Sequence, residues 1–250
     1  MHILVTNDDG VLAPGLLALT HAMREIADKV TVLAPDRNWS ASGHVKTLHR
    51  PLRIIEVELE DGSLAWATDG APSDCVALAQ LGFITEKIDL VVSGINPNAN
   101  IGHDVTYSGT VTAAMEAAIS GKPGIAVSLD APEHHVGHLD FSAAAKIARK
   151  IVEALIYENF KELGSLIYNI NVPYLPYESF KGILITRQGL RIYRDELVKR
   201  LDPRGRPYYW IGGQAPTGKH EDGTDFGALQ DGFVSLTPLQ LDLTDYKERD

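Results

Sequence analysis

Short apolar runs recur along the chain and predict buried strands. Five such runs span residues 3–6, 30–34, 90–94, 124–128 and 166–172. They are rich in Val, Ile and Leu with little regular polar alternation, which is typical of strands covered on both faces. We therefore expect these runs to pair in one mostly parallel sheet.

The segments between these runs have the spacing of amphipathic helices. Helices are predicted over 15–27, 72–83, 108–121 and 141–160. In the first of them, Leu16, Leu19, Met23 and Ile26 fall on one stripe, which is the pattern of a helix that covers a sheet. The alternation of strands and helices predicts an α/β fold, with helices on both faces of the sheet.

Two stretches interrupt this alternation. Residues 45–70 alternate apolar and polar positions around Asp61-Gly62, which predicts an antiparallel hairpin inserted in an α/β core of residues 1–188. Residues 189–250 are predicted to form a C-terminal hairpin arm and tail, with the turn at 202–205. A lone hairpin is not stable in water, so we expect the arm to pack on a second subunit. The alternative is that it folds back on its own domain.

Charge and cysteine content narrow the class of protein. The formal net charge of −10 argues against a nucleic-acid polymer as partner, because phosphate backbones bind Lys/Arg surfaces. The single cysteine, Cys75, excludes an intrachain disulfide and a cysteine-based zinc cluster, and we expect it to be buried. There is no signal-peptide pattern and no apolar run of the roughly 20 residues that a membrane span needs. These features predict a cytoplasmic protein that does not bind membranes.

Polar residues follow three of the predicted strands, in the loops 7–10, 34–44 and 95–110. In an open parallel sheet, loops at the carboxyl ends of strands meet at one edge. Asp8, Asp9, a hydroxyl such as Ser40 and the side-chain oxygen of Asn96 would form the oxygen ligand set that Mg²⁺ or Mn²⁺ prefers. The alternative is that the two acids only cap the helix that begins near Gly15.

The start of the helix predicted over 108–121 suits a phosphate. Ser108, Gly109 and Thr110 would present free N–H groups and the positive end of the helix dipole to an anion. The alternative is an ordinary N-cap, with no ligand. The loop before this helix carries several further polar side chains that could line a site, among them Asn100 and Asp104.

Several basic residues could have either a structural or a functional role. His44 could act as an acid or base, although a lone histidine is more often structural. Arg187, Arg191 and Arg194 could be exposed or could meet an anionic substrate. The chain has no GxGxxG, GxxxxGK[ST] or GxSxG motif and no DxD after its first strand, so the common dinucleotide, P-loop, hydrolase-elbow and aspartyl-phosphate sites are not indicated.

Six segments of the chain form a distinctive set: "ILVTNDDG", "APDRNWSASGH", "TDGAPSDCV", "VVSGIN", "GHDVTYSGTVTAAMEA" and "ITRQG". In their order and spacing, these segments resemble the SurE (survival protein E) family nearly end to end. The resemblance implies a Rossmann-like core and a C-terminal arm exchanged between subunits of a homodimer or homotetramer. It also implies a metal-dependent phosphoric monoester hydrolase, acting as a 5′-nucleotidase on nucleoside 5′- and 3′-monophosphates and in some members on short polyphosphate.

Carried over residue by residue, the resemblance places one divalent cation per subunit on Asp8, Asp9, Ser40 and Asn96. The substrate phosphate falls on Asn96, Ser108, Gly109 and Thr110. The chain departs from the family at 96–100, which usually reads Asn-x-Gly-x-Asn, and at His103, where an acid is common.

The expected mechanism uses a cation-bound water as the nucleophile. Asp9, in preference to Asp8, orients or deprotonates this water, and a covalent phosphoryl group on Asp8 is the alternative. Two other functions fit the same loops: a metal-dependent deacetylase, and a regulator that binds nucleotides without turning them over. Phosphate release from nucleotides separates the phosphatase from the deacetylase, and stoichiometric nucleotide binding without turnover would indicate the regulator.

Overall fold

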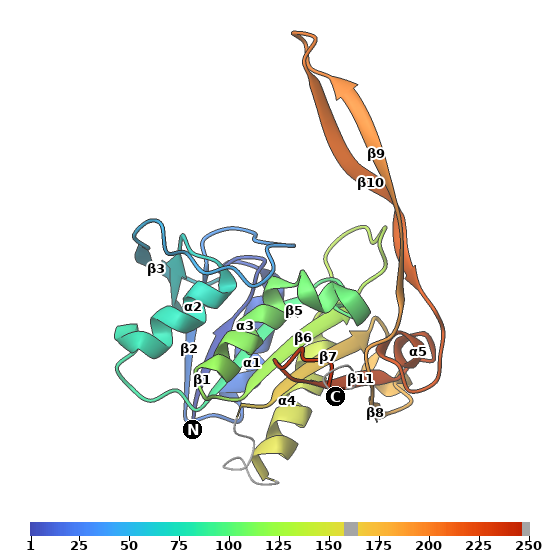
Figure 1. Ribbon diagram of the computed structural model, residues 1–250. Helices are drawn as coiled ribbons and strands as arrows, with labels where there is room; N and C mark the ends of the chain where they lie inside the picture. The colour runs from blue at the N-terminus through green and yellow to red at the C-terminus, as the bar shows by residue number, and fades with distance from the viewer. Residues whose placement is uncertain (158–164, 247–250) are drawn as a thin grey trace.

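A nine-stranded sheet forms the body of the protein in the computed structural model, which describes residues 1–157 and 165–246. Its strands lie in the order β3-β4-β2-β1-β5-β6-β7-β11-β8 (Figure 1). The central strands are β1 (His2–Thr6), β2 (Lys29–Pro35), β5 (Leu90–Asn96), β6 (Gly124–Asp130) and β7 (Ile167–Pro173). These five are the predicted apolar runs, and each pairs in parallel with its neighbour, so the predicted α/β, Rossmann-like fold class is confirmed.

Five helices of the described chain cover this sheet. They are α1 (Pro14–Arg24), α2 (Pro72–Leu78), α3 (Gly109–Ile119), α4 (Ser142–Tyr157) and α5 (Asp225–Gln230). Single turns add η1 (Ala79–Phe83), η2 (Gly102–Thr106) and η4 (Tyr177–Ser179). The first four helices match the predicted ones. Residues 158–160, which were predicted to end the fourth helix, lie outside the described residues.

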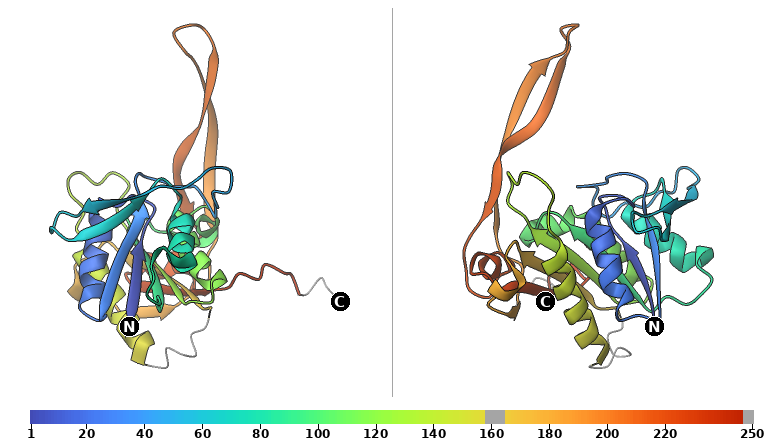
Figure 2. Two further views of the ribbon diagram at one scale, coloured as in Figure 1. Left: turned by 90° about the vertical axis from the view of Figure 1, so that its left-hand side faces the viewer. Right: turned by 180° about the vertical axis from the view of Figure 1, so that it is seen from behind.

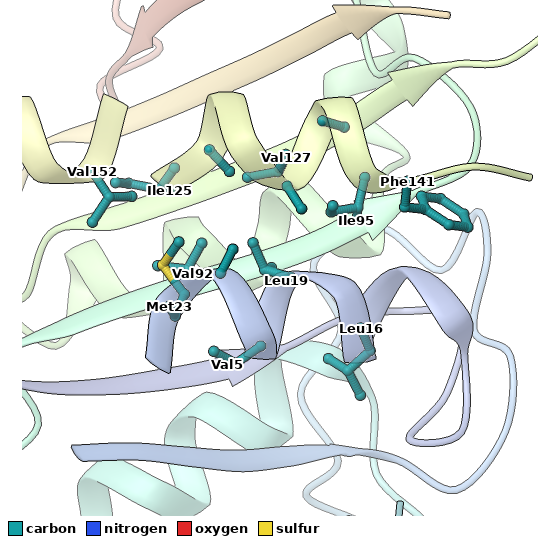
Figure 3. Close-up of a cluster of buried hydrophobic side chains, with 14 of the residues drawn as sticks. Val5, Leu16, Leu19, Met23, Val92, Ile95, Ile125, Val127, Phe141 and Val152 are labelled. Atoms are coloured by element: carbon teal, nitrogen blue, oxygen red, sulfur yellow. The ribbon is translucent and has the colours of Figure 1, made fainter. Parts of the chain in front are cut away.

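Successive side chains of the central strands are buried on opposite faces of the sheet. In β1, Ile3 and Val5 pack with α1 and α4, whereas Leu4 packs with α2 and α3. Figure 3 shows the first of these clusters, in which residues from α1 and α4 meet residues of the strands between them. This is why the strands read as continuous apolar runs in the sequence.

The stripe predicted on the first helix faces this core. Leu16, Leu19 and Met23 are fully buried, and each such burial contributes about 1.5–3 kcal/mol. Ile26 lies beyond the end of α1 and is only partly buried. The helix therefore ends earlier than the periodicity predicts, because the chain turns into β2 at Lys29.

The predicted hairpin of residues 45–70 forms one edge of the sheet. β3 (Ile54–Glu58) and β4 (Leu64–Thr68) pair antiparallel, and Gly62 in the turn between them has a φ of +78°. β4 also pairs in parallel with β2, so the hairpin extends the sheet. The predicted hairpin is therefore present, and residues 45–53 form a loop ahead of it.

The second predicted hairpin is the two-stranded arm of β9 (Arg191–Leu201) and β10 (Pro207–Gly218). It projects away from the body of the molecule (Figures 1 and 2), and large apolar side chains such as Leu197, Trp210 and Ile211 are exposed on it. Its turn is held by Asp202, whose carboxylate accepts hydrogen bonds from the backbone N–H groups of Arg204 and Arg206.

The chain returns to the sheet after the arm. β11 (Val234–Leu239) pairs antiparallel with β7 and in parallel with β8 (Ile183–Ile185). The segment predicted as arm and tail therefore also supplies a helix, α5, and a strand to the body. Among the described residues, no helix combines the length and the apolar character that crossing a membrane requires.

Candidate active site

The loop after β1 holds the two adjacent acids in a braced turn. Asn7 closes this turn, because its Nδ2 donates to the Gly10 carbonyl at 3.0 Å and its Oδ1 accepts from the Gly10 N–H at 3.2 Å. Gly10 has a φ of +109°, a conformation that side-chain-bearing residues rarely adopt. The result is that Asp8 is buried, at 3% exposure, while Asp9 is half-buried.

The start of α3 lies directly against Asp8. The Thr110 hydroxyl donates to Asp8 Oδ1, and a Cβ added to Gly109 would stand 2.7 Å from the Cβ of Asp8. Glycine is therefore required where the helix meets the carboxylate. Ser108 is the N-cap, because its Oγ accepts the Val111 N–H at 3.0 Å. The capping role considered for Ser108 is confirmed, and Ser108 also faces the site.

The loop after β2 is fastened to the same place. The Trp39 N–H donates to the Asp8 carbonyl at 2.7 Å, and the Gly43 N–H donates to the Tyr107 carbonyl at 2.9 Å. Between these two anchors lies Ser40, which shares a cavity with Asp8. The first contact thus fixes this loop to the loop after β1, and the second fixes it to the segment before α3.

The loop after β5 is ordered by amide side chains. Asn96 Nδ2 donates to the Asn98 carbonyl at 2.5 Å, which turns its Oδ1 away from that carbonyl. Asn100 is buried and donates from Nδ2 to Ser128 Oγ at 2.8 Å, while its carbonyl accepts from the side chains of Asn169 and Asn171. The Asn-Pro-Asn-Ala-Asn sequence therefore still forms a fixed turn that places Asn96 and Asn98 at the cavity.

These loops surround a cavity of about 820 Å³ at the carboxyl edge of the sheet. The predicted residues that line it are Asp8, Ser40, Asn96, Asn100, Asp104 and Ser108. Its remaining wall includes Tyr107, Asp130, Glu133, Tyr174, Arg191 and Phe226. Of the described residues, four carboxylates and one guanidinium line the cavity, which makes it strongly acidic.

The Asp8 and Asp9 carboxyls have raised pKa values. Burial raises the pKa of Asp8, and the hydrogen bond from Thr110 only partly opposes this. Burial, followed by the nearby charge of Asp8, raises the pKa of Asp9 to about 7. Within the described chain neither carboxylate is paired with a Lys, Arg or His side chain. Two carboxylates without a counter-charge are the environment that a bound cation would relieve.

The donor set fits a hard divalent cation. Asp8, Ser40 and Asn96 offer carboxylate, hydroxyl and amide oxygens from three loops to one cavity, and Asp9 stands beside Asp8. No cluster of three or more His, Cys, Asp or Glu side chains suited to a metal occurs among the described residues, so a zinc-type site is not indicated there. The oxygen-rich set matches Mg²⁺ or Mn²⁺, which retain several waters.

Four predicted residues lie outside the cavity wall. Gly109 and Thr110 lie against Asp8, and Asp9 follows Asp8 in the chain, with Asn38 Nδ2 3.4 Å from its Oδ1. His44 is also away from the cavity, with Nε2 2.9 Å from the buried Glu116 carboxylate. This contact favours the structural interpretation of His44.

Asp104 joins the cavity to the base of the arm. Its carboxylate accepts hydrogen bonds from Arg191 Nε, at 2.7 Å, and from the Tyr193 hydroxyl. Of the three arginines left open by the sequence, Arg191 lines the cavity. Arg187 pairs with Glu221, and Arg194 lies 3.1 Å from Thr217 Oγ1.

Sequence reasoning missed Asp130. It is the last residue of β6 and lines the cavity, and burial raises the pKa of its carboxyl. The signal was present, because "GIAVSLD" is an apolar run that ends directly in an acid, as the first strand does. Phe226 and Arg191 could not be found in this way, because only the return of the chain through α5 and the arm brings them to the cavity.

Comparisons with known proteins agree with this site. The family profile described as "Survival protein SurE" matches residues 3–195. The chain is 54% identical to the 5′-nucleotidase SurE of Herpetosiphon aurantiacus, over 98% of this chain and 94% of that protein. It is 52% identical to the 5′-nucleotidase SurE of Chloroflexus aggregans, over 99% and 96% of the two chains.

The fold matches a solved structure as well. The crystal structure of the SurE protein from Aquifex aeolicus superposes with a TM-score of 0.82 at 41% identity, covering 100% of this chain and 97% of that one. Identity at this level over the full length, together with the fold and the family profile, leaves one conclusion. The chain belongs to the SurE family.

Proposed function

We propose that this protein is a 5′-nucleotidase, which hydrolyses nucleoside 5′-monophosphates to nucleoside and inorganic phosphate. The names of its relatives support this activity, and so does the site. The observation that carries the proposal is the convergence of Asp8, Ser40, Asn96 and Ser108, from the loops after β1, β2 and β5, on one cavity.

The charge of the cavity supports dependence on a divalent cation. A phosphate monoester brings up to two negative charges to a wall that already holds four carboxylates and one guanidinium among its described residues. Without added positive charge, repulsion would oppose substrate binding. Asp8, Asp9, Ser40 and Asn96 would hold the cation, which polarises a phosphate oxygen when bound.

The residues around Asp8 would orient the substrate. The N-terminus of α3 directs its dipole toward the place where Ser108 and Asp8 meet, so a phosphate there would be stabilised as its charge redistributes. Asn96 would position a further oxygen of the phosphate. Gly109 keeps the helix close enough to take part.

Asp9 is the residue we assign to the attacking water. Asp8 is engaged by Thr110 and the start of α3, whereas Asp9 accepts a single long hydrogen bond from Asn38. Asp9 is therefore freer to orient the water and accept its proton. The water oxygen bonds to phosphorus, the bond from phosphorus to the sugar oxygen breaks, and the proton released by the water neutralises that leaving oxygen.

A phosphate-release screen tests the proposal. Purified protein would be incubated with nucleoside 5′-monophosphates after EDTA treatment, and then with Mg²⁺ or Mn²⁺ restored. We expect release only with the cation. Full activity in EDTA would contradict the cation dependence. Binding without turnover would indicate a nucleotide-binding regulator instead, and deacetylation without phosphate release would indicate the other hydrolase. Nucleoside 3′-monophosphates and short polyphosphate belong in the same screen as proposed additional substrates.

The arm is proposed to join two copies of this chain. Leu197 and Ile211 are cross-strand partners on one face of the arm, Trp210 is exposed on the other face, and nothing in the described chain covers them. Exposed apolar surfaces of this kind mark interaction sites. Light scattering after size exclusion tests this. Ile211→Glu should shift the protein from dimer or tetramer to monomer, with Arg204→Glu in the exposed turn as the matched control. An unchanged mass for Ile211→Glu would contradict the assembly role.

A further inference from the structure

Asp130 is a carboxylate that the proposed chemistry leaves without a role. It is half-buried at the end of β6 and lines the same cavity as Asp8 and Asn96. Within the described chain its carboxylate accepts no hydrogen bond, and Arg191 supplies the positive charge near it. A carboxylate withdrawn from water without a hydrogen-bond donor is unfavourable. A ligand with donor groups, bound in the cavity, would satisfy it.

The sheet sets the distance from Asp130 to the proposed phosphate site. β5 lies between β1 and β6, and Thr6 and Ala126 both pair with Ser93. Asp8 follows Thr6 by two residues, and Asp130 follows Ala126 by four. Two strand spacings across the sheet, about 10 Å, and two residues of rise along it, about 7 Å, place the two positions roughly 12 Å apart. With its phosphate beside Asp8, a nucleotide would extend its sugar toward Asp130.

The charge and the hydrogen-bonding capacity of Asp130 indicate which part of the substrate it contacts. A negative carboxylate repels the phosphate, so Asp130 belongs to the other end of the ligand. Ionised carboxylates only accept hydrogen bonds, and the two oxygens suit a pair of neighbouring hydroxyls. In dinucleotide-binding α/β folds, an acidic residue makes this kind of contact with a ribose hydroxyl. The vicinal hydroxyls of a ribose are therefore the donors that fit best.

We propose that Asp130 binds the ribose hydroxyls of the substrate and so makes the enzyme prefer ribonucleotides to deoxynucleotides. This inference rests on the proposed function. Arg191 supports the contact: Asp104 holds its guanidinium, with Arg191 Nε 2.7 Å from Asp104 Oδ2, beside the same cavity. Its positive charge favours the ionised form of Asp130, which is the form that accepts two hydroxyl hydrogen bonds.

A substrate series tests the proposal. Values of kcat/KM would be measured for the ribo-, 2′-deoxy- and 2′,3′-dideoxy-forms of one nucleoside 5′-monophosphate, and for p-nitrophenyl phosphate, which has no sugar. The wild-type protein should prefer the ribo-form to the dideoxy-form by about 10- to 100-fold, the range of hydrogen bonds to a charged group. Asp130→Ala should abolish that preference through a raised KM for the ribo-form, and should leave p-nitrophenyl phosphate within about twofold of wild type.

Glu133→Ala provides the matched control. Glu133 is an exposed carboxylate of the same cavity, so its removal deletes the same charge and should leave the ribo-preference intact. Three results would overturn the proposal: no ribo-preference in the wild type, an unchanged preference in Asp130→Ala, or an equal loss for p-nitrophenyl phosphate, which would make Asp130 structural. Failure of the proposed function is recognised separately, because the wild-type protein would then release phosphate from none of the four substrates, and the inference would fall with it.

Discussion

Carboxylates at the start of α3 and in its second half have opposite surroundings. Asp8 meets the start of the helix beside Asp9, and neither is paired with a basic side chain of the described chain. Glu116, in the second half of α3, accepts from Lys46 Nζ at 2.8 Å and lies 2.9 Å from His44 Nε2. The partners of each carboxylate indicate its role. Glu116 holds the segment of His44 and Lys46 in place, whereas Asp8 and Asp9 have no basic partner in the described chain and need a ligand to balance their charge.

The pKa values of the two groups differ in the same sense. Burial opposes ionisation of Glu116, but the hydrogen bonds from His44 and Lys46 outweigh it and lower the pKa of Glu116. Nothing comparable compensates Asp9, whose pKa is raised to about 7. Glu116 therefore stabilises the fold as an anion. Ionised Asp8 and Asp9 destabilise the fold, and a bound cation would offset this destabilisation.

The largest expected effect is on turnover, which should depend far more on Asp9 than on Glu116. Asp9→Asn should reduce turnover by about 10³-fold or more, because it removes both a cation ligand and the group that accepts the proton of the attacking water. Its melting temperature without a divalent cation should not fall, since an unpaired charge has been removed. Turnover and thermal unfolding of the purified variant check both statements. A near-normal rate would show that Asp9 is not the base.

The next effect is a difference in pH dependence without divalent cations. Because the folded-state pKa of Asp9 is raised from 3.8 to about 7, its contribution to stability is present below pH 3.8 and is lost as the pH rises through 7. The loss amounts to a few kcal/mol at full ionisation. In EDTA, Asp9→Asn should therefore gain stability over the wild type between pH 5 and 8. Parallel wild-type and variant curves across that range would contradict the raised pKa.

A smaller effect is expected at the paired carboxylate. Glu116→Ala should lower the free energy of unfolding by about 1–3 kcal/mol, because His44 and Lys46 lose their partner and the loop that carries Ser40 is released. Turnover per folded molecule should change by less than about tenfold. Glu153→Ala, at an exposed position of α4, controls for the same substitution in a helix. Equal destabilisation by the two variants would mean that the Glu116 ion pairs contribute nothing.

Elements that depend on neighbouring residues could be predicted from the sequence. Apolar runs identify strands that are covered on both faces, and the rule that loops meet at the carboxyl edge of a parallel sheet was enough to bring Asp8, Ser40 and Asn96 together. The capping role of Ser108 also follows from its immediate neighbours.

Contacts between distant segments could not be read in the same way. Glu116 and His44 are 72 residues apart, so the sequence left His44 open to a catalytic role. Arg191 reaches the cavity because the base of the arm packs on η2 through Asp104, 87 residues away. β11 was missed because it is a short strand with a proline that joins the sheet antiparallel, after the arm.

Asp8 and Asp9 are proposed to form a cation site, and not merely a pair of tolerated buried acids. Isothermal titration of EDTA-treated protein with Mn²⁺ tests it most directly, and requires no substrate. We expect one Mn²⁺ to bind per chain in the wild type and in Glu116→Gln, and none in Asp8→Asn. Absence of binding to the wild type, or equal binding to Asp8→Asn, would contradict the claim.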